Sequence, residues 1–225
     1  MDLTAELVAL VERTEPDPGP EPGTVEHTDA DFAQMADTVL AEHDPEHLWV
    51  FAYGSLIWNP EFEIEEQRRA VAHGWHRSFC LTLTRWRGTR ELPALMLALD
   101  RGGTCVGMVY RLPDSDNHSQ VVRLLQREID ANPPTNVPRW VKVMTAGGSI
   151  KALAFVALPS GNAYAGKHPL PEVASILSRA AGHWGSAAQY AFNTVNKLEE
   201  HGIRDRNLWR IQKLMAAEIR AAHNM

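Results

Sequence analysis

Residues 48–58 read Leu48-Trp49-Val50-Phe51-Ala52-Tyr53-Gly54-Ser55-Leu56-Ile57-Trp58, an almost wholly apolar run that breaks at Gly54-Ser55. A continuous apolar run of this length is typical of a strand buried on both faces, although a buried helix gives the same pattern. Asn59-Pro60 follows the run and favours the strand. We therefore predict a buried strand that ends in a turn, with the rest of the fold built around it.

The turn at Gly54-Ser55 has two interpretations. Glycine lets the backbone turn without a Cβ atom and lets a ligand approach the main chain closely. Successive N–H groups freed at such a turn form a concavity that favours an anion such as a carboxylate. Glycine in a strand more often marks a bulge or bend, so the turn alone favours a structural role.

The composition limits the class of protein. The chain has 225 residues, of which 44% are hydrophobic and seven are Trp, enough for the core of one large domain. A formal net charge of −6 argues against a nucleic-acid or anionic-membrane partner. Residues 1–11 lack a basic signal-peptide region, and no apolar run reaches the length of a membrane span. We therefore expect a cytoplasmic protein.

The N-terminal residues 1–46 are predicted to form a helical arm with a proline-rich linker, and residues 47–225 to form the main domain. A short helix opens the chain, and residues 15–23 are too rich in proline to continue it. Thr28 and Asp31 have the spacing of a capping box at the start of a second helix. No chemistry is apparent in the arm.

The main domain is predicted to place strands first and helices afterwards. Gly102 and Gly103 indicate a β-hairpin turn between strands at residues 92–100 and 104–112. The other predicted elements are a strand within residues 70–86, a helix from about residue 113 to Asp130, strands at 140–144 and 150–158, and three helices after Pro171. This order favours an α+β fold, with an antiparallel sheet or small β-barrel flanked by α-helices.

Glu128 is the most informative charged residue. Helical spacing from Val121, Leu124 and Leu125 places it on or beside the buried face of its helix. Burial and the negative end of the helix dipole both disfavour a carboxylate there and raise its pKa. A raised pKa suits a general base that works near neutral pH. The alternative is a structural ion pair with a basic residue across the fold.

Other candidates for chemistry are weaker. Cys80 and Cys105 lie in apolar strand patterns, which favours buried thiols over nucleophiles, although one disulfide remains open. Ser55 lacks the Gly-x-Ser-x-Gly motif of a nucleophile elbow. His43 and His47 are four residues apart, but a proline lies between them and zinc needs more ligands. We therefore expect no metal site.

Several stretches together resemble the ChaC-type gamma-glutamylcyclotransferase family. They are Tyr53-Gly54-Ser55-Leu56-Ile57-Trp58, Gly74-Trp75-His76-Arg77-Ser78-Phe79-Cys80, Arg87-Gly88-Thr89, Asp100-Arg101-Gly102-Gly103-Thr104-Cys105-Val106-Gly107, Arg127-Glu128-Ile129, and Gly182-His183-Trp184-Gly185-Ser186 followed by Tyr190. The resemblance runs from about Trp49 to the C-terminus and excludes the arm. The chain departs from the family pattern at Ala94, where the family has Gly, and in a longer segment after Glu128.

The resemblance implies a gamma-glutamylcyclotransferase-like fold, a mixed or antiparallel barrel, and the activity of a lyase. It implies cleavage of glutathione, a small-molecule substrate, to 5-oxoproline and Cys-Gly without a cofactor. It also implies that Glu128 is the catalytic acid and base, and that Tyr53, Gly54, Ser55, Leu56 and Tyr190 bind substrate. Two alternatives stay open: the same cyclisation on other gamma-glutamyl amines, and a non-catalytic soluble accessory of cation transport.

Overall fold

The computed structural model describes residues 1–129 and 131–225. The chain divides into two compact units. The first unit comprises Met1–Glu21, Phe79–Leu97 and Ala165–Met225, and the second comprises Pro22–Ser78 and Ala98–Tyr164. The predicted boundary between residues 46 and 47 remains a prediction.

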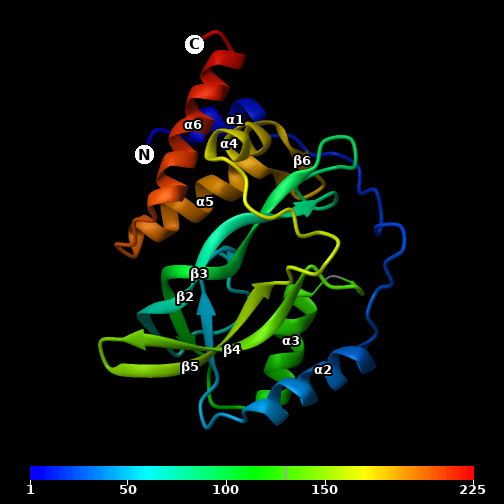
Figure 1. Cartoon of the computed structure of the whole chain (residues 1–225), viewed down its shortest axis with the longest axis vertical. Coiled ribbons are helices and arrows are strands. Elements are labelled where there is room, and N and C mark those ends of the chain that lie inside the picture. The colour runs from blue at the N-terminus through cyan, green and yellow to red at the C-terminus, as the bar shows by residue number, and fades with distance from the viewer. Residues whose placement is uncertain (130) are drawn as a thin grey trace. The chain divides into compact units, whose positions relative to one another are not determined.

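A closed barrel of five strands forms the centre of the second unit (Figure 1). The strands are β1 (Trp49–Ala52), β2 (Glu66–Leu83), β3 (Ala94–Arg111), β4 (Asn136–Thr145) and β5 (Gly148–Ala157), in the order β1-β3-β2-β4-β5. Strand β1 is antiparallel to β3, with Phe51 opposite Val109. Its parallel pairing with β5, Val50 to Leu153, closes the barrel. The prediction of an α+β fold with a small mixed barrel is confirmed.

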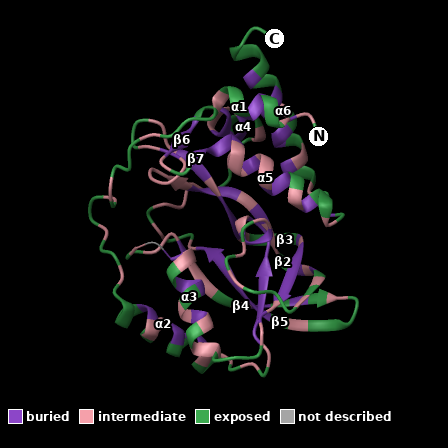
Figure 2. Ribbon diagram, turned by 180° about the vertical axis from the view of Figure 1, so that it is seen from behind, coloured by how far each residue is buried: buried purple, intermediate pink, exposed green. Residues whose placement is uncertain are grey.

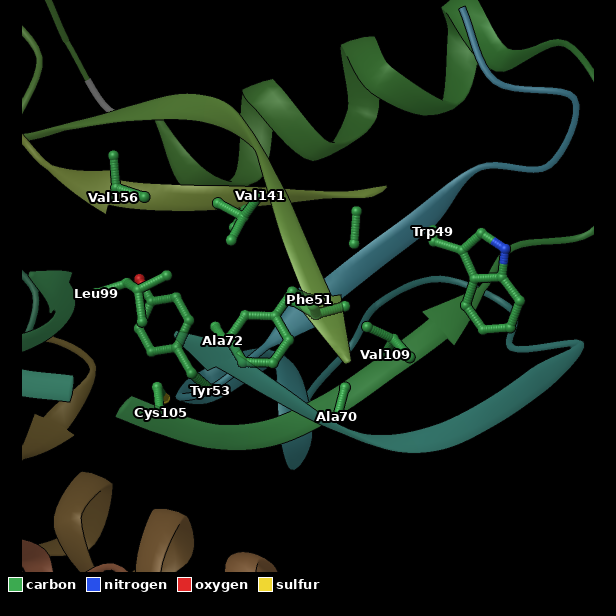
Figure 3. Close-up of a cluster of buried hydrophobic side chains, with 13 residues drawn as sticks. Trp49, Phe51, Tyr53, Ala70, Ala72, Leu99, Cys105, Val109, Val141 and Val156 are labelled. Atoms are coloured by element: carbon green, nitrogen blue, oxygen red, sulfur yellow. The ribbon is translucent and has the colours of Figure 1, made fainter. Parts of the chain in front are cut away.

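The interior of the barrel is filled by apolar side chains from all five strands (Figure 3). All four residues of β1 are buried, which confirms the strand predicted from the apolar run. Phe51 and Leu99 are fully buried in this cluster, and Figure 2 shows the barrel strands as largely buried. Barrels with few strands are packed with side chains, so a ligand is expected at the loops rather than inside.

The predicted β-hairpin around residues 101–103 is wrong. Strand β3 runs without reversal from Ala94 to Arg111, and pairs with β5 at Leu99 and with β1 at Val109. Gly102 and Gly103 have φ values of 98° and 72° and lie in an exposed stretch of the strand. Positive φ values at glycine here bend a continuous strand, as in a bulge, and do not reverse it.

Two helices belong to the second unit and lie side by side in Figures 1 and 2. Helix α2 (Asp29–Glu42) begins with the predicted capping box, in which Thr28 and Asp31 exchange hydrogen bonds, so that prediction is confirmed. Helix α3 (Asn117–Glu128) ends at Glu128. The predicted helix end at Asp130 lies outside the described residues.

The first unit contains the end of β2 (from Phe79), the start of β3 (to Leu97), four helices and two very short strands. The helices and the short strands are α1 (Ala5–Val11), α4 (Leu170–Arg179), α5 (Ala187–Glu200), α6 (Arg206–Ala222), β6 (Ala181–Gly182) and β7 (Gly185–Ser186). The three helices predicted after Pro171 are confirmed. In the described part of the chain, no helix combines the length and apolar character needed to cross a membrane.

The first 21 residues are attached to the first unit by polar contacts. Oε1 of Gln212, on α6, accepts hydrogen bonds from the N–H groups of Asp2 at 2.9 Å and Leu3 at 2.8 Å. Arg85 donates to both carboxylate oxygens of Asp17, at 2.8 and 2.7 Å. The guanidinium group of Arg85 lowers the pKa of Asp17 to about 2. Residues 1–21 are therefore an integral part of the first unit.

Candidate functional site

Strand β1 runs into a tight turn at Gly54 that continues as the short 3₁₀ helix η1 (Ser55–Ile57). The turn is closed by three main-chain hydrogen bonds: Ile57 N donates to the Gly54 oxygen at 3.0 Å, and Trp58 N and Asn59 N donate to the Ser55 oxygen at 3.1 and 2.8 Å. Within the described part of the chain, the N–H groups of Gly54, Ser55 and Leu56 donate to no protein acceptor. Three consecutive N–H donors can bind a carboxylate.

Tyr53 is the only predicted site residue whose side chain belongs to the described barrel core. Its hydroxyl donates to the Phe155 oxygen at 2.7 Å, and its ring lies among the packed side chains in Figure 3. Its carbonyl oxygen accepts a hydrogen bond from Arg77 Nε at 3.0 Å. Tyr53 therefore shapes the strand end that leads into the turn.

Arg77 supports the turn and was missed by the sequence analysis as a site residue. Its side chain is buried, with 4% exposed, and it also donates to the Val106 oxygen. It thereby joins the end of β1 to β3. The signal in the sequence was its alternation with Phe79 and Leu81, which places an arginine on the buried side of a strand.

Glu128 is the last residue of α3 and is largely buried, with 15% of its side chain exposed. Val121, Leu124 and Leu125 are buried on the same helix, so its predicted place beside the buried face is confirmed. Burial raises the pKa of Glu128 to about 7, while Arg127 lowers it and Glu61 raises it further. A carboxyl group with this pKa holds and releases a proton near neutral pH.

Among the described residues, the charged partner of Glu128 is its neighbour in sequence, Arg127, and not a residue across the fold. Arg127 Nε lies 3.2 Å from Glu128 Oε1 and 3.9 Å from Glu61 Oε2. Arg127 Nη1 donates to the Pro60 oxygen at 2.8 Å. Pro60 and Glu61 directly follow the Gly54–Asn59 turn in sequence, so Arg127 connects the end of α3 to that segment.

Tyr190 lies on α5 in the first unit and is half-buried. Its ring makes an edge contact with Phe79, with centroids 6.4 Å apart, and Arg87 Cζ lies 5.8 Å from its centroid. Arg87 is fixed by a hydrogen bond from Nη1 to the Ser186 oxygen at 2.9 Å, and burial lowers its pKa. The structure thus gives Tyr190 a cationic neighbour within its own unit.

Cys80 and Cys105 are both buried, and they are not joined in a disulfide. Among the described residues, no group of three or more His, Cys, Asp or Glu side chains is arranged to hold a metal ion. A surface hollow of about 250 Å³ in the second unit is lined by Val25, His27, Met35 and Asn132, among others, and by none of the predicted site residues.

Comparison with solved structures defines the fold class as that of gamma-glutamyl cyclotransferases. The crystal structure of a gamma-glutamyl cyclotransferase specific to glutathione from yeast has a TM-score of 0.68. The match covers 77% of this chain and 97% of that chain at 19% identity, and at this identity it shows the fold alone.

Sequence comparison gives the family. A family model described as ChaC-like protein matches residues 48–218. The glutathione-specific gamma-glutamylcyclotransferase of Escherichia coli (strain K12) is 34% identical over 177 residues, which are 78% of this chain and 76% of the relative. Glutathione-specific gamma-glutamylcyclotransferase 1 of Mus musculus is 30% identical over 159 residues, which are 69% of this chain and 71% of the relative. The chain belongs to the ChaC-like protein family.

Proposed function

We propose that the protein is a gamma-glutamylcyclotransferase that cleaves glutathione to 5-oxoproline and Cys-Gly, with Glu128 as general acid and base. The observation that carries this proposal is the Glu128 carboxyl group, largely buried at the end of α3 with its pKa raised to about 7. Membership of the ChaC-like family and the glutathione-specific relatives support the substrate.

The reaction needs one proton removed and one proton supplied. The α-amine of the gamma-glutamyl group must lose a proton before it attacks the side-chain carbonyl of the same residue. The new C–N bond closes the five-membered ring, and the bond to the cysteine nitrogen breaks as that nitrogen gains a proton. A carboxylate that accepts the first proton becomes the acid that donates the second, so Glu128 can serve both steps.

Ring closure also requires the substrate to bend. We propose that the N–H groups of Gly54, Ser55 and Leu56 bind the α-carboxylate, with Tyr53 fixing the start of the turn. Holding the amine against the carbonyl turns ring closure into a well-oriented intramolecular step, which can supply much of the rate acceleration. Tyr190 is proposed as a further substrate-binding residue on the basis of family resemblance.

We also propose that the protein acts in the cytoplasm on this small molecule, without a nucleic-acid or membrane partner. The net charge of −6 opposes binding to polyanions.

Replacing Glu128 by glutamine tests the proposed function. Glu128→Gln keeps the shape of the side chain but removes the base, so kcat for 5-oxoproline release should fall by at least about 10²–10⁴-fold. Glutathione binding measured by calorimetry should persist, because the proposed α-carboxylate contacts come from the turn. Glu63→Gln, at an exposed glutamate, is the matched control and should keep wild-type kcat.

A folded Glu128→Gln protein with near-normal turnover would overturn the catalytic assignment. A panel of other gamma-glutamyl amines, assayed for 5-oxoproline with the wild-type protein, decides the substrate. Higher kcat/KM for one of these than for glutathione would keep the chemistry and replace the proposed substrate. Failure to release 5-oxoproline from any of them would remove the proposed function.

A further inference from the structure

Arg127 occupies a junction between the end of α3 and the segment that follows the Gly54 turn. Its side chain is 14% exposed. Nη1 donates to the Pro60 oxygen at 2.8 Å, and Nε lies 3.2 Å from Glu128 Oε1. One planar guanidinium therefore contacts both a main-chain carbonyl of the segment and the proposed catalytic carboxyl group. This geometry depends on a forked donor, which arginine has and lysine lacks.

The contact between Arg127 and Glu128 is unusual for neighbours on a helix. Successive helical residues point in different directions, so adjacent side chains do not normally face each other. Here Glu128 is the last helical residue, and the hydrogen bond to Pro60 holds the Arg127 side chain toward the same region. The Pro60 carbonyl thus fixes Arg127, and Arg127 in turn limits where the Glu128 carboxyl group can lie.

The segment that receives Arg127 is itself fixed in an unusual conformation. Glu61 has a φ of 56°, in the left-handed region that non-glycine residues seldom adopt. Asn59 Nδ2 donates to Glu61 Oε1 at 2.6 Å, and Asn59 N donates to the Ser55 oxygen at 2.8 Å. Backbone of this kind persists where its surroundings determine it, and such residues are often found at functional sites.

We propose that Arg127 is a positioning residue that holds the Glu128 carboxyl group in a fixed place relative to the Gly54–Asn59 turn. We propose further that the negative charge of Glu61 opposes the effect of Arg127 on Glu128. The proposal rests on the proposed function, because Glu128 must be the group that transfers the proton. It assigns Arg127 a role in aligning that group against a substrate bound at the turn.

The two charges act on Glu128 in opposite directions. Arg127 favours the ionised carboxylate and lowers the pKa of Glu128, whereas Glu61 disfavours a second negative charge and raises it. Arg127 lies on α3 itself, and Glu61 lies on the segment after the turn; these are the charged groups that act on Glu128 in the described structure. Changing either one should move the pH range in which Glu128 works as a base.

The pH dependence of kcat/KM tests the charge effects, because its acid limb reports the base of the free enzyme. Arg127→Gln should move the acid limb to higher pH by about one pH unit, since a cation beside the carboxylate is lost. Glu61→Gln should move it to lower pH by a smaller amount, because Glu61 has the weaker effect of the two on Glu128 and its side chain is more than half exposed. If Arg127 and Glu61 contributed only to folding, neither substitution would move the acid limb.

Arg127→Lys distinguishes the effect of the Arg127 side-chain geometry from the effect of its positive charge. Lysine keeps the positive charge but has no fork with which to bind Pro60 and Glu128 together. We expect an acid limb close to the wild-type pH, with kcat lowered by roughly 10-fold or more from misalignment of the carboxyl group. Thermal melts of each variant confirm that the assayed protein is folded.

Arg123→Gln is the matched control, because it removes the same charge from an exposed position on the same helix. It should leave both kcat and the acid limb unchanged. If Glu128→Gln is inactive while folded Arg127→Gln and Arg127→Lys keep the wild-type pH profile and kcat, the role of Arg127 is overturned and the proposed function stands. If Glu128→Gln is active, the proposed function itself fails.

Discussion

At the scale of single residues, Glu128 shows which properties of a site can and cannot be predicted from helical spacing. Its place beside Val121, Leu124 and Leu125 followed from the repeat of the helix, and the direction of its pKa shift followed from burial. Its ion pair with Arg127 was not predictable, because neighbours on a helix normally diverge. That contact depends on the Pro60 carbonyl, which is distant in sequence.

The raised pKa of Glu128 also predicts how stability depends on pH. Its folded pKa of about 7 lies above the usual value, so the folded state holds the extra proton more tightly. The stability contribution is full below the unfolded pKa and is lost as pH rises through about 7. Glu128→Gln should therefore be more stable than wild type at about pH 8, by up to about 3 kcal/mol, and closer to it at about pH 5.

Denaturant unfolding of both proteins at the two pH values measures this difference. Arg127 keeps its hydrogen bond to Pro60 and its charge interaction with Glu61 in the variant, so the substitution does not strand a cation. A variant that is less stable than wild type by the same amount at both pH values would show that Glu128 is a structural ion-pair partner.

At the scale of elements, the period of the hydrophobic pattern was sufficient to predict the helices and strand β1. It was not sufficient to predict whether a strand continues or reverses its direction. The C-terminal helices and the capping box of α2 were predicted because their signals are local. The bend of β3 at Gly102-Gly103 was taken for a reversal, because two glycines permit both outcomes. Only the pairing of Leu99 with Val156 and of Val109 with Phe51 decides between them.

Helix α6 makes a polar contact that the sequence pattern did not predict. Gln212 is fully buried and holds the N–H groups of Asp2 and Leu3. Gln212→Ala leaves both donors without this acceptor, which should cost about 1–3 kcal/mol of unfolding free energy. Gln34→Ala, at an exposed glutamine of α2, is the control and should change stability by less than about 0.5 kcal/mol.

Urea unfolding of the two variants gives the comparison. Equal stability losses in both would mean that Gln212 contributes no more than a surface residue. A loss confined to Gln212→Ala would show that α6 and the N-terminal residues are stabilised together.

At the scale of the whole molecule, the family match and the two structural units have different boundaries along the sequence. The match begins at residue 48, yet residues 1–21 belong to the first unit and residues 22–47 to the second. The sequence predicts an arm for these N-terminal residues, which carry no recognisable chemistry. The two helices of this segment were predictable from local patterns. Its contact residues were not, because ion pairs such as Asp17 with Arg85 join residues far apart in sequence.

Substitutions in α1 test whether this N-terminal segment contributes to stability. Leu7 is 4% exposed and Leu10 is 43% exposed, and α1 packs against α5 and α6. Leu7→Ala should lower the unfolding free energy by about 2–5 kcal/mol, because it removes a buried side chain. Leu10→Ala should change it by less than about 0.5 kcal/mol. Equal melting temperatures for the two variants would show that α1 is only loosely attached.

Closure of the barrel affects the tendency of the chain to aggregate during synthesis. Strand β1 has β3 on one side and β5 on the other, so its N–H and C=O groups are committed within the chain. Apolar strands without charge or proline readily add to strands of other molecules when their edges are open. Residues 49–52 are shielded only once β5 has been made and paired, more than 90 residues later. Aggregation should therefore be most severe for nascent or refolding chains that still lack β5, and refolding yield should improve on dilution.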